Sequence, residues 1–84
     1  MAEVQVGYDE LADVLYVSLS DPDRHARSGS DEHGLVWRKL PNGRFVGLTV
    51  QNFRRRWAGR MDELQRIILA RMPEVANEEV AELA

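Results

Sequence analysis

The stretch Tyr8-Asp9-Glu10-Leu11-Ala12-Asp13-Val14-Leu15-Tyr16-Val17 decides the fold of the first half of the chain. It joins two segments rich in valine, leucine and tyrosine, residues that are typical of β-strands. The short connection between them begins and ends with an aspartate and suits a hairpin. Because aspartate side chains readily accept hydrogen bonds from nearby backbone N–H groups, we interpret Asp9 and Asp13 as turn residues and not as a catalytic pair.

The two segments that flank this turn follow the two-residue period of β-strands. With Tyr8 opposite Val14, each face of the hairpin receives large apolar side chains. The first face would carry Val4, Val6, Tyr8, Val14 and Tyr16, and the second would carry Leu15, Val17 and Leu19. We therefore expect a sheet that is apolar on both faces.

A second hairpin is predicted around Pro41-Asn42-Gly43. Its strands would span residues 35–40 and 44–51. Proline followed by asparagine and glycine suits a three-residue turn in which Gly43 takes the left-handed conformation. That register puts Trp37 opposite Gly47, where the indole ring can cover the surface that glycine leaves bare. A two-residue Asn42-Gly43 turn is the competing register.

After Phe53 the apolar residues change to helical spacing. They recur at Met61, Leu64, Ile67, Ile68 and Met72. Pro73 ends this helix, and Asn77 resembles the cap of a short second helix over 78–83. The expected fold class is α+β: an antiparallel four-stranded β-meander of two hairpins, with one C-terminal helix and a short second helix packed on one face.

The 84 residues allow one small domain over 1–84. We expect the β-meander over 1–53, the helix over 58–72, and an acidic tail or short helix over 74–84. The chain has no cysteine, no basic and apolar signal pattern at its start, and no apolar run long enough to span a membrane. A cytoplasmic protein without membrane association is therefore expected.

The polar segment 20–34 holds the residues best suited to metal or acid–base chemistry. These residues are Asp21, Asp23, His25, Asp31, Glu32 and His33. Their spacing matches no metal motif, so we interpret the segment mainly as a solvated loop, with room for a short edge strand around 26–32. The chain also lacks a Gly-x-Ser-x-Gly elbow and a glycine-rich phosphate loop. We expect no enzyme, no catalytic or metal-binding residue and no cofactor; an enzyme or metal binder using this loop is the most distant alternative.

Charged residues are segregated along the chain. Residues 1–23 contain six acids and no Lys or Arg, whereas residues 34–60 contain seven bases and no acid. The sharpest basic feature lies at the junction between sheet and helix. The candidate interaction surface consists of Trp37, Phe53, Arg54, Arg55, Arg56 and Trp57.

Three interpretations of this surface stay open. The arginines and aromatic rings could contact phosphates and stack on bases. Alternatively, Phe53 and Trp57 could anchor the junction while the arginines are solvated. In the third interpretation the arginines pair with acids of a partner subunit, such as those of the tail at Glu78, Glu79 and Glu82.

A homodimer is the expected assembly, because one helix covers only one face of a sheet. Leaving about 400 Å² of apolar surface uncovered would forgo roughly 10 kcal/mol, which is comparable to the whole stability of a small domain. A two-fold dimer buries the second face with identical elements. A small protein partner is also expected, and nucleic acid is a less favoured partner.

The first hairpin resembles that of a small prokaryotic family of unknown function, whose signature is Tyr-Asp-x-x-x-Asp-x-Leu-Tyr-[Ile/Val]. The matching residues are Tyr8, Asp9, Asp13, Leu15, Tyr16 and Val17. Further similarities at Gly34-Leu35-Val36, at Gly43-Arg44 and at the strand containing Gly47 extend the resemblance over about residues 4–53. Residues 38–42 replace the family's acidic turn, and Thr49 replaces its strand glutamate.

This resemblance implies a dimeric β-meander with a helix and with no established activity. Proteins of this kind look like the small partner in toxin–antitoxin-like gene pairs. The predicted function is therefore a homodimeric protein-interaction module, conceivably antitoxin-like. A nucleic-acid-binding or regulatory module that uses Arg54–Arg56 is the alternative.

Overall fold

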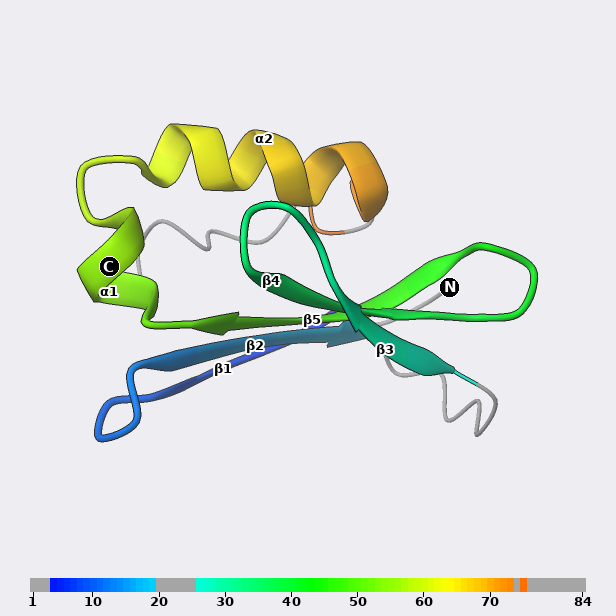
Figure 1. The fold of residues 1–84 in the computed structure, drawn as a ribbon, viewed down its shortest axis with the longest axis horizontal. Helices are drawn as coiled ribbons and strands as arrows, with labels where there is room; N and C mark the ends of the chain where they lie inside the picture. Colours follow the sequence, from blue (N-terminus) through cyan, green and yellow to red (C-terminus); the bar gives the residue numbers. More distant parts are fainter. Residues whose placement is uncertain (1–3, 20–25, 74, 76–84) are drawn as a thin grey trace.

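Five antiparallel strands form one sheet in the computed structural model, which describes residues 4–19, 26–73 and 75 (Figure 1). The strands are β1 (Val4–Asp9), β2 (Val14–Leu19), β3 (Arg27–Ser30), β4 (Leu35–Lys39) and β5 (Phe45–Gln51). They lie in the order β1-β2-β5-β4-β3, so β5 occupies the centre while β1 and β3 form the edges. The fold class is α+β, as predicted. The strand added to the four expected ones, β3, falls in the segment where the sequence left room for a short edge strand.

Two helices follow the sheet and lie on one side of it (Figure 1). They are α1 (Phe53–Trp57) and α2 (Met61–Arg71), and α2 lies within the predicted helix 58–72. Gly59, with a φ of +80°, allows the chain to turn between them. The second helix expected over 78–83 lies outside the described residues.

The core is the layer between the helices and the covered face of the sheet. Its buried hydrophobic residues are Leu15, Val17, Leu19, Leu35, Trp37, Leu40, Val46, Leu48, Val50, Phe53, Trp57, Leu64, Ile68, Met72 and Val75. No polar or charged residue is buried in the described part of the chain. The two helices therefore cover one face of the sheet with apolar side chains, as a single amphipathic layer does.

The first hairpin is paired one residue away from the predicted register. Tyr8 lies opposite Leu15 and Asp9 lies opposite Val14, so Asp9 belongs to the strand and not to the turn. A slip of one residue moves every side chain of a strand to the other face. Val4, Val6 and Tyr8 consequently share the covered face with Leu15, Val17 and Leu19.

The opposite face of the sheet is therefore less apolar than expected. Tyr16, the largest residue on it, is 47% exposed. Its neighbours across the strands are Gly7, Thr49, Val36 and Ser30, in that row. The expectation of large apolar side chains on both faces is wrong for this hairpin, because it depended on the pairing of Tyr8 with Val14.

The second hairpin combines both of the predicted registers. Its turn has the three-residue form: the N–H of Leu40 donates to the carbonyl of Arg44 (2.8 Å), and Gly43 has a φ of +92°. An irregularity at Arg38 and Lys39 then shifts the pairing by one residue, as a β-bulge does. Beyond it, Trp37 lies opposite Leu48.

The predicted pairing of Trp37 with Gly47 is therefore wrong. Gly47 lies opposite Arg38, and a Cβ atom built on Gly47 would lie 3.3 Å from the Cβ of Arg38. The side chain of Arg38, and not the indole of Trp37, covers the glycine. The indole of Trp37 instead lies on the face of the sheet that the helices cover.

Asp13 joins the first hairpin to the first helix. Its backbone lies in the left-handed region (φ +56°), and its carbonyl accepts the N–H of Phe53 (3.0 Å). Its carboxylate accepts the Tyr8 hydroxyl (2.7 Å) and the backbone N–H groups of Arg54 (2.9 Å) and Arg55 (3.3 Å). These N–H groups belong to the first turn of α1 and have no partner within the helix. The bond from the Arg54 N–H, followed by that from Tyr8, holds the pKa of Asp13 below its ordinary value.

Asp9 is the last residue of β1, and its carboxylate accepts the N–H of Ala12 (3.1 Å), so its side chain stabilises the turn as predicted although its backbone is paired in the strand. Asp13 is also structural: besides the Tyr8 hydroxyl, its carboxylate binds backbone N–H groups that lie 41 and 42 residues along the chain, outside its own turn. Both aspartates of the signature are thus explained without catalysis. Through Asp13, the first hairpin therefore also positions the first turn of α1.

Replacing Asp13 by alanine should lower the midpoint of thermal unfolding more than replacing Asp9 by alanine. The first change removes the acceptor of Tyr8 and of two helical N–H groups and puts alanine at a positive φ. The second change removes one exposed turn bond. Asp13→Asn tolerates the left-handed backbone and keeps one acceptor oxygen, so its midpoint should lie between the two. Circular dichroism melts measure all three variants, and equal midpoints for the two alanine variants would contradict this role of Asp13.

Candidate functional site

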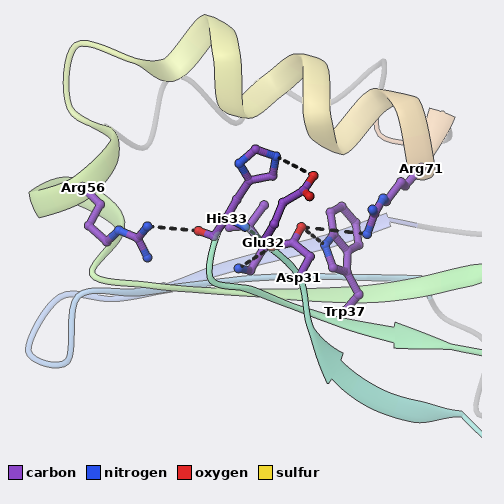
Figure 2. Close-up of polar contacts among 7 residues, drawn as sticks. Asp31, Glu32, His33, Trp37, Arg56 and Arg71 are labelled. Atoms are coloured by element: carbon purple, nitrogen blue, oxygen red, sulfur yellow. Dashed lines mark hydrogen bonds and ion pairs between the residues drawn. The ribbon is translucent and has the colours of Figure 1, made fainter.

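Asp31 organises the turn between β3 and β4. Its Oδ1 atom accepts the backbone N–H groups of His33 (2.8 Å) and Leu35 (3.0 Å), and its Oδ2 atom accepts the indole Nε1–H of Trp37 (2.8 Å) (Figure 2). The turn closes through the N–H of Gly34, which donates to the carbonyl of Asp31 (3.2 Å). Asp31 therefore fixes both the turn and the orientation of the Trp37 ring.

The groups around Asp31 keep its carboxylate ionised and donate hydrogen bonds to both of its oxygens. Its side chain is 9% exposed, and the Arg71 Nη1 atom lies 3.8 Å from its Oδ2 atom. Burial raises the pKa of this carboxyl group, but hydrogen bonds from Trp37, Leu35 and His33 outweigh burial and lower the pKa below its ordinary value. A carboxylate whose two oxygens already accept hydrogen bonds is poorly suited to act as a general base.

Arg71, the last residue of α2, lies on the two aromatic rings beside Asp31. Its guanidinium carbon is 5.0 Å from the ring centroid of Trp37 and 5.0 Å from that of Phe45. The two rings meet edge to face, with their centroids 5.3 Å apart. The Nζ atom of Lys39 lies 5.8 Å from the Phe45 ring. This cation–π cluster joins the end of α2 to strands β4 and β5 of the sheet.

A pocket of about 710 Å³ opens between β3 and this cluster. Arg27 and Gly29 line it on the strand side, Leu40 and Pro41 line it at the β4–β5 turn, and the cluster forms the remaining wall. Gly29 lies opposite Trp37 and has no atom within 4 Å of a Cβ built on it. The missing side chain therefore leaves the pocket open along the edge of the sheet.

Among the described residues, no strand lies beside the outer edge of β3. The N–H of Asp31 donates to the carbonyl of Leu35 (2.9 Å), which makes these two residues a hydrogen-bonded pair of the ladder. Such pairs alternate along an antiparallel ladder, so Gly29 directs its backbone groups toward β4. Ser28 and Ser30 direct theirs toward the free edge of the sheet.

The residues of the interaction surface predicted from the sequence do not all lie on the surface of the structure. Trp37, Phe53 and Trp57 are buried in the core and do not form an exposed surface. The anchoring interpretation therefore holds for Phe53 and Trp57, which fix α1 to the sheet.

The three arginines Arg54, Arg55 and Arg56 are exposed on α1. Two of them already contact neighbouring groups. Arg54 lies with its guanidinium carbon 4.8 Å from the Tyr8 ring, and the Nη2 atom of Arg56 donates to the carbonyl of His33 (3.0 Å; Figure 2). These contacts hold the arginines over the hairpin turns.

The structure does not bring together the loop residues that the most distant alternative, a metal binder, would use. His33 Nε2 lies 3.5 Å from the carboxylate of Glu32, while Asp31 is directed toward Trp37 and Arg71 (Figure 2). In the described ranges, no three histidine, aspartate or glutamate side chains converge on one point. Asp21, Asp23 and His25 lie outside the described residues. None of the helices described is long and apolar enough to cross a membrane.

Two residues of the pocket, Gly29 and Arg71, are not among the residues predicted from the sequence. The segment Arg27–Ser30 has no apolar alternation that would mark it as a strand. Arg71 has the position of an ordinary basic residue in the last turn of a helix. The one sequence feature that could have indicated this pocket is the excess of basic residues over 34–60, which includes Lys39. That excess indicates an interaction surface on α1 more strongly than one at the pocket. Comparison of the chain with known protein families, curated proteins and solved structures finds no match.

Acid should destabilise the protein through the carboxylates that folding makes more acidic. Asp31 and Asp13 both have lowered pKa values, so the unfolded chain binds protons on them at higher pH than the folded chain does. Their contribution to the free energy of unfolding is complete above the ordinary aspartate pKa of about 3.9, and it is lost progressively as the pH falls below that value and through the lower pKa values of the folded chain. Urea unfolding followed by tryptophan fluorescence between neutral pH and pH ~3 measures this loss.

The variant Asp31→Asn should be less stable than the parent at neutral pH by roughly 1–3 kcal/mol, because one of the donors around it loses its acceptor. Its stability should also fall less steeply in acid. Asp62→Asn, which changes an exposed carboxylate in the first turn of α2, is the matched control. A pH slope of Asp31→Asn equal to that of the parent would show that Asp31 does not contribute to the acid sensitivity.

Proposed function

We propose that this chain is a protein-interaction domain that binds an extended segment of a partner protein along the free edge of β3. The partner segment would add a sixth strand to the sheet, beside the pocket. The observation that carries the proposal is the coincidence of a strand edge that no described residue pairs with and an open pocket on the helix side of the same strand. In strand addition, backbone hydrogen bonds supply affinity, and pockets for alternate side chains supply specificity.

The sequence of β3 suits this role. Ser28-Gly29-Ser30 has small side chains that do not obstruct an approaching strand, and all residues of β3 are exposed. Exposed strand edges are commonly protected by charges, proline or bulges along the strand. In β3 the charged residue, Arg27, lies at one end of the strand.

A second copy of this chain is the other partner that this edge accepts. Ser28-Gly29-Ser30 is symmetrical about Gly29, so two β3 edges can pair around a two-fold axis through that residue. In such a dimer Gly29 of each copy would lie beside Gly29 of the other, so no side chain would occupy the space that this residue leaves in the pocket. We therefore favour a different polypeptide as the partner.

The arginines of α1 give less support to a nucleic-acid-binding function. Their aromatic neighbours Phe53 and Trp57 are buried and cannot stack on bases. Arg56 already binds the turn at His33. Binding of an oligonucleotide through α1 would therefore contradict the proposal.

The variant Ser28→Pro tests strand addition without breaking the existing ladder. The N–H that proline removes points to the free edge, so pairing of β3 with β4 is retained. Peptides selected from a random display library on the full chain should bind the parent and Ser28→Ala alike and lose most of their affinity for Ser28→Pro. In NMR hydrogen exchange, the amides of Ser28 and Ser30 should exchange rapidly in the free chain and become protected in the complex.

Several results would overturn this proposal. They are failure of the library to yield any binder, selected peptides that bind Ser28→Pro as well as the parent, and protection that appears at α1 and not at β3. A further contradicting result is binding of a single-stranded oligonucleotide at physiological salt that is lost when Arg55 is replaced by glutamine. Sedimentation velocity of the free chain distinguishes the two partners: a dimer that Ser28→Pro dissociates would identify the second copy as the occupant.

A further inference from the structure

We infer that the pocket beside β3 selects a glutamate side chain, and that the segment added to β3 is acidic at alternate positions. This inference rests on the proposed function and specifies the chemistry of the partner. It is carried by the charges around the pocket and by the position of Gly29.

The charges that line the pocket favour an anion. Three cations, Arg27, Lys39 and Arg71, lie around it, and Asp31 is the one acid among the described residues of its wall. Both oxygens of Asp31 accept hydrogen bonds, so this carboxylate offers little to a ligand cation. The excess of positive charge therefore faces the incoming segment.

Arg71 is oriented to bind a carboxylate. Its guanidinium lies on the faces of Trp37 and Phe45, an arrangement that uses the plane of the group and leaves N–H donors at its edge. The Arg71 side chain is 38% exposed, so these donors are within reach of a ligand. A guanidinium edge and a carboxylate form paired, charge-assisted hydrogen bonds.

The register of β3 determines which partner residue reaches this site. Because Ser28 and Ser30 present the free backbone groups, the partner residue beside Gly29 directs its side chain to the helix side of the sheet, where Gly29 leaves space. The apolar wall at Leu40 and Pro41 suits the methylene groups of a long acidic side chain. Glutamate fits this description better than aspartate, whose stem is shorter.

The same alternation predicts a second acidic position. The partner residue two positions away on the same face lies beside Arg27, and the residue two positions away in the other direction lies beside Asp31. An acid is therefore favoured beside Arg27 and disfavoured beside Asp31. The expected pattern is two glutamates separated by one residue.

Synthetic peptides test this inference on the full chain. The probes are an eight-residue, β-prone peptide with two glutamates separated by one residue, and two counterparts in which glutamine or lysine replaces both glutamates. Isothermal titration should show that the glutamate peptide binds roughly tenfold or more tightly than the glutamine peptide. The lysine peptide should bind weakest, and the preference for glutamate should decrease as the salt concentration rises.

Variants of the pocket identify the residues that make this selection. Arg71→Gln and Lys39→Gln should each reduce the preference for glutamate over glutamine. Arg66→Gln, which removes the same charge from an exposed position of α2 outside the pocket, should leave the preference unchanged. Because Arg71 also contacts the core, the exposed Lys39 provides the variant that does not depend on packing. Gly29→Leu should fill the pocket and weaken the binding of the glutamate peptide.

The outcomes separate the inference from the proposed function. Equal affinity for the three peptides, with loss of all binding in Ser28→Pro, would overturn the acidic selection and leave strand addition intact. A glutamate preference that survives in Lys39→Gln and Arg71→Gln, or that is lost equally in Arg66→Gln, would also overturn it. Absence of binding by all three peptides, together with failure of the display selection, would overturn both.

Discussion

The carboxylate of Asp13 is the contact on which the arrangement of sheet and helices depends. It binds Tyr8 at the end of β1 and the first N–H groups of α1, and the Asp13 carbonyl binds Phe53. Phe53 and Trp57 are thereby held in the core, from which α2 continues across the sheet. A five-residue helix is too short to be stable alone, so its position requires such tertiary contacts. Because the direction of α2 follows from α1, the position of Arg71 beside β3 depends on Asp13 as well.

Asp31 plays the corresponding role at the other end of the sheet. It binds its own turn and orients Trp37, against which Arg71 packs. Each aspartate contacts groups both near to it and far from it in the sequence: Asp31 binds Trp37 and lies beside Arg71, and Asp13 binds Tyr8 and the first N–H groups of α1. In both places a carboxylate accepts backbone N–H groups that have no backbone acceptor, as side chains commonly do at turns and helix ends.

Local patterns predicted the elements of this fold but not the pairings between them. Residue periodicity gave the two hairpins and α2, because Val14–Leu19 and the apolar residues from Met61 onward are strongly patterned. It gave the wrong register at Tyr8, since the Asp13–Arg54 bond that accompanies the observed pairing joins residues 41 positions apart, which no local window contains. The site was largely missed for a similar reason. Gly29 and Arg71 form one site because a strand edge and a helix end meet in three dimensions, which no sequence pattern indicates. Phe53 and Trp57 were prominent in the sequence, but they are large apolar residues of the core.

The central position of β5 has a consequence for how the chain folds. β5 is the last of the described strands in the sequence, yet it lies between β2 and β4 and joins the two halves of the sheet. Until residues 45–51 have left the ribosome, β1–β2 and β3–β4 are separate two-stranded ribbons without a common neighbour, and such ribbons are marginally stable in water. Sheet assembly therefore has to wait for more than half of the chain and then close the long connection between β2 and β5. During synthesis the nascent chain exposes the inner edge of β2, with Leu15 and Val17 beside it, and this edge is where premature pairing with other chains is expected.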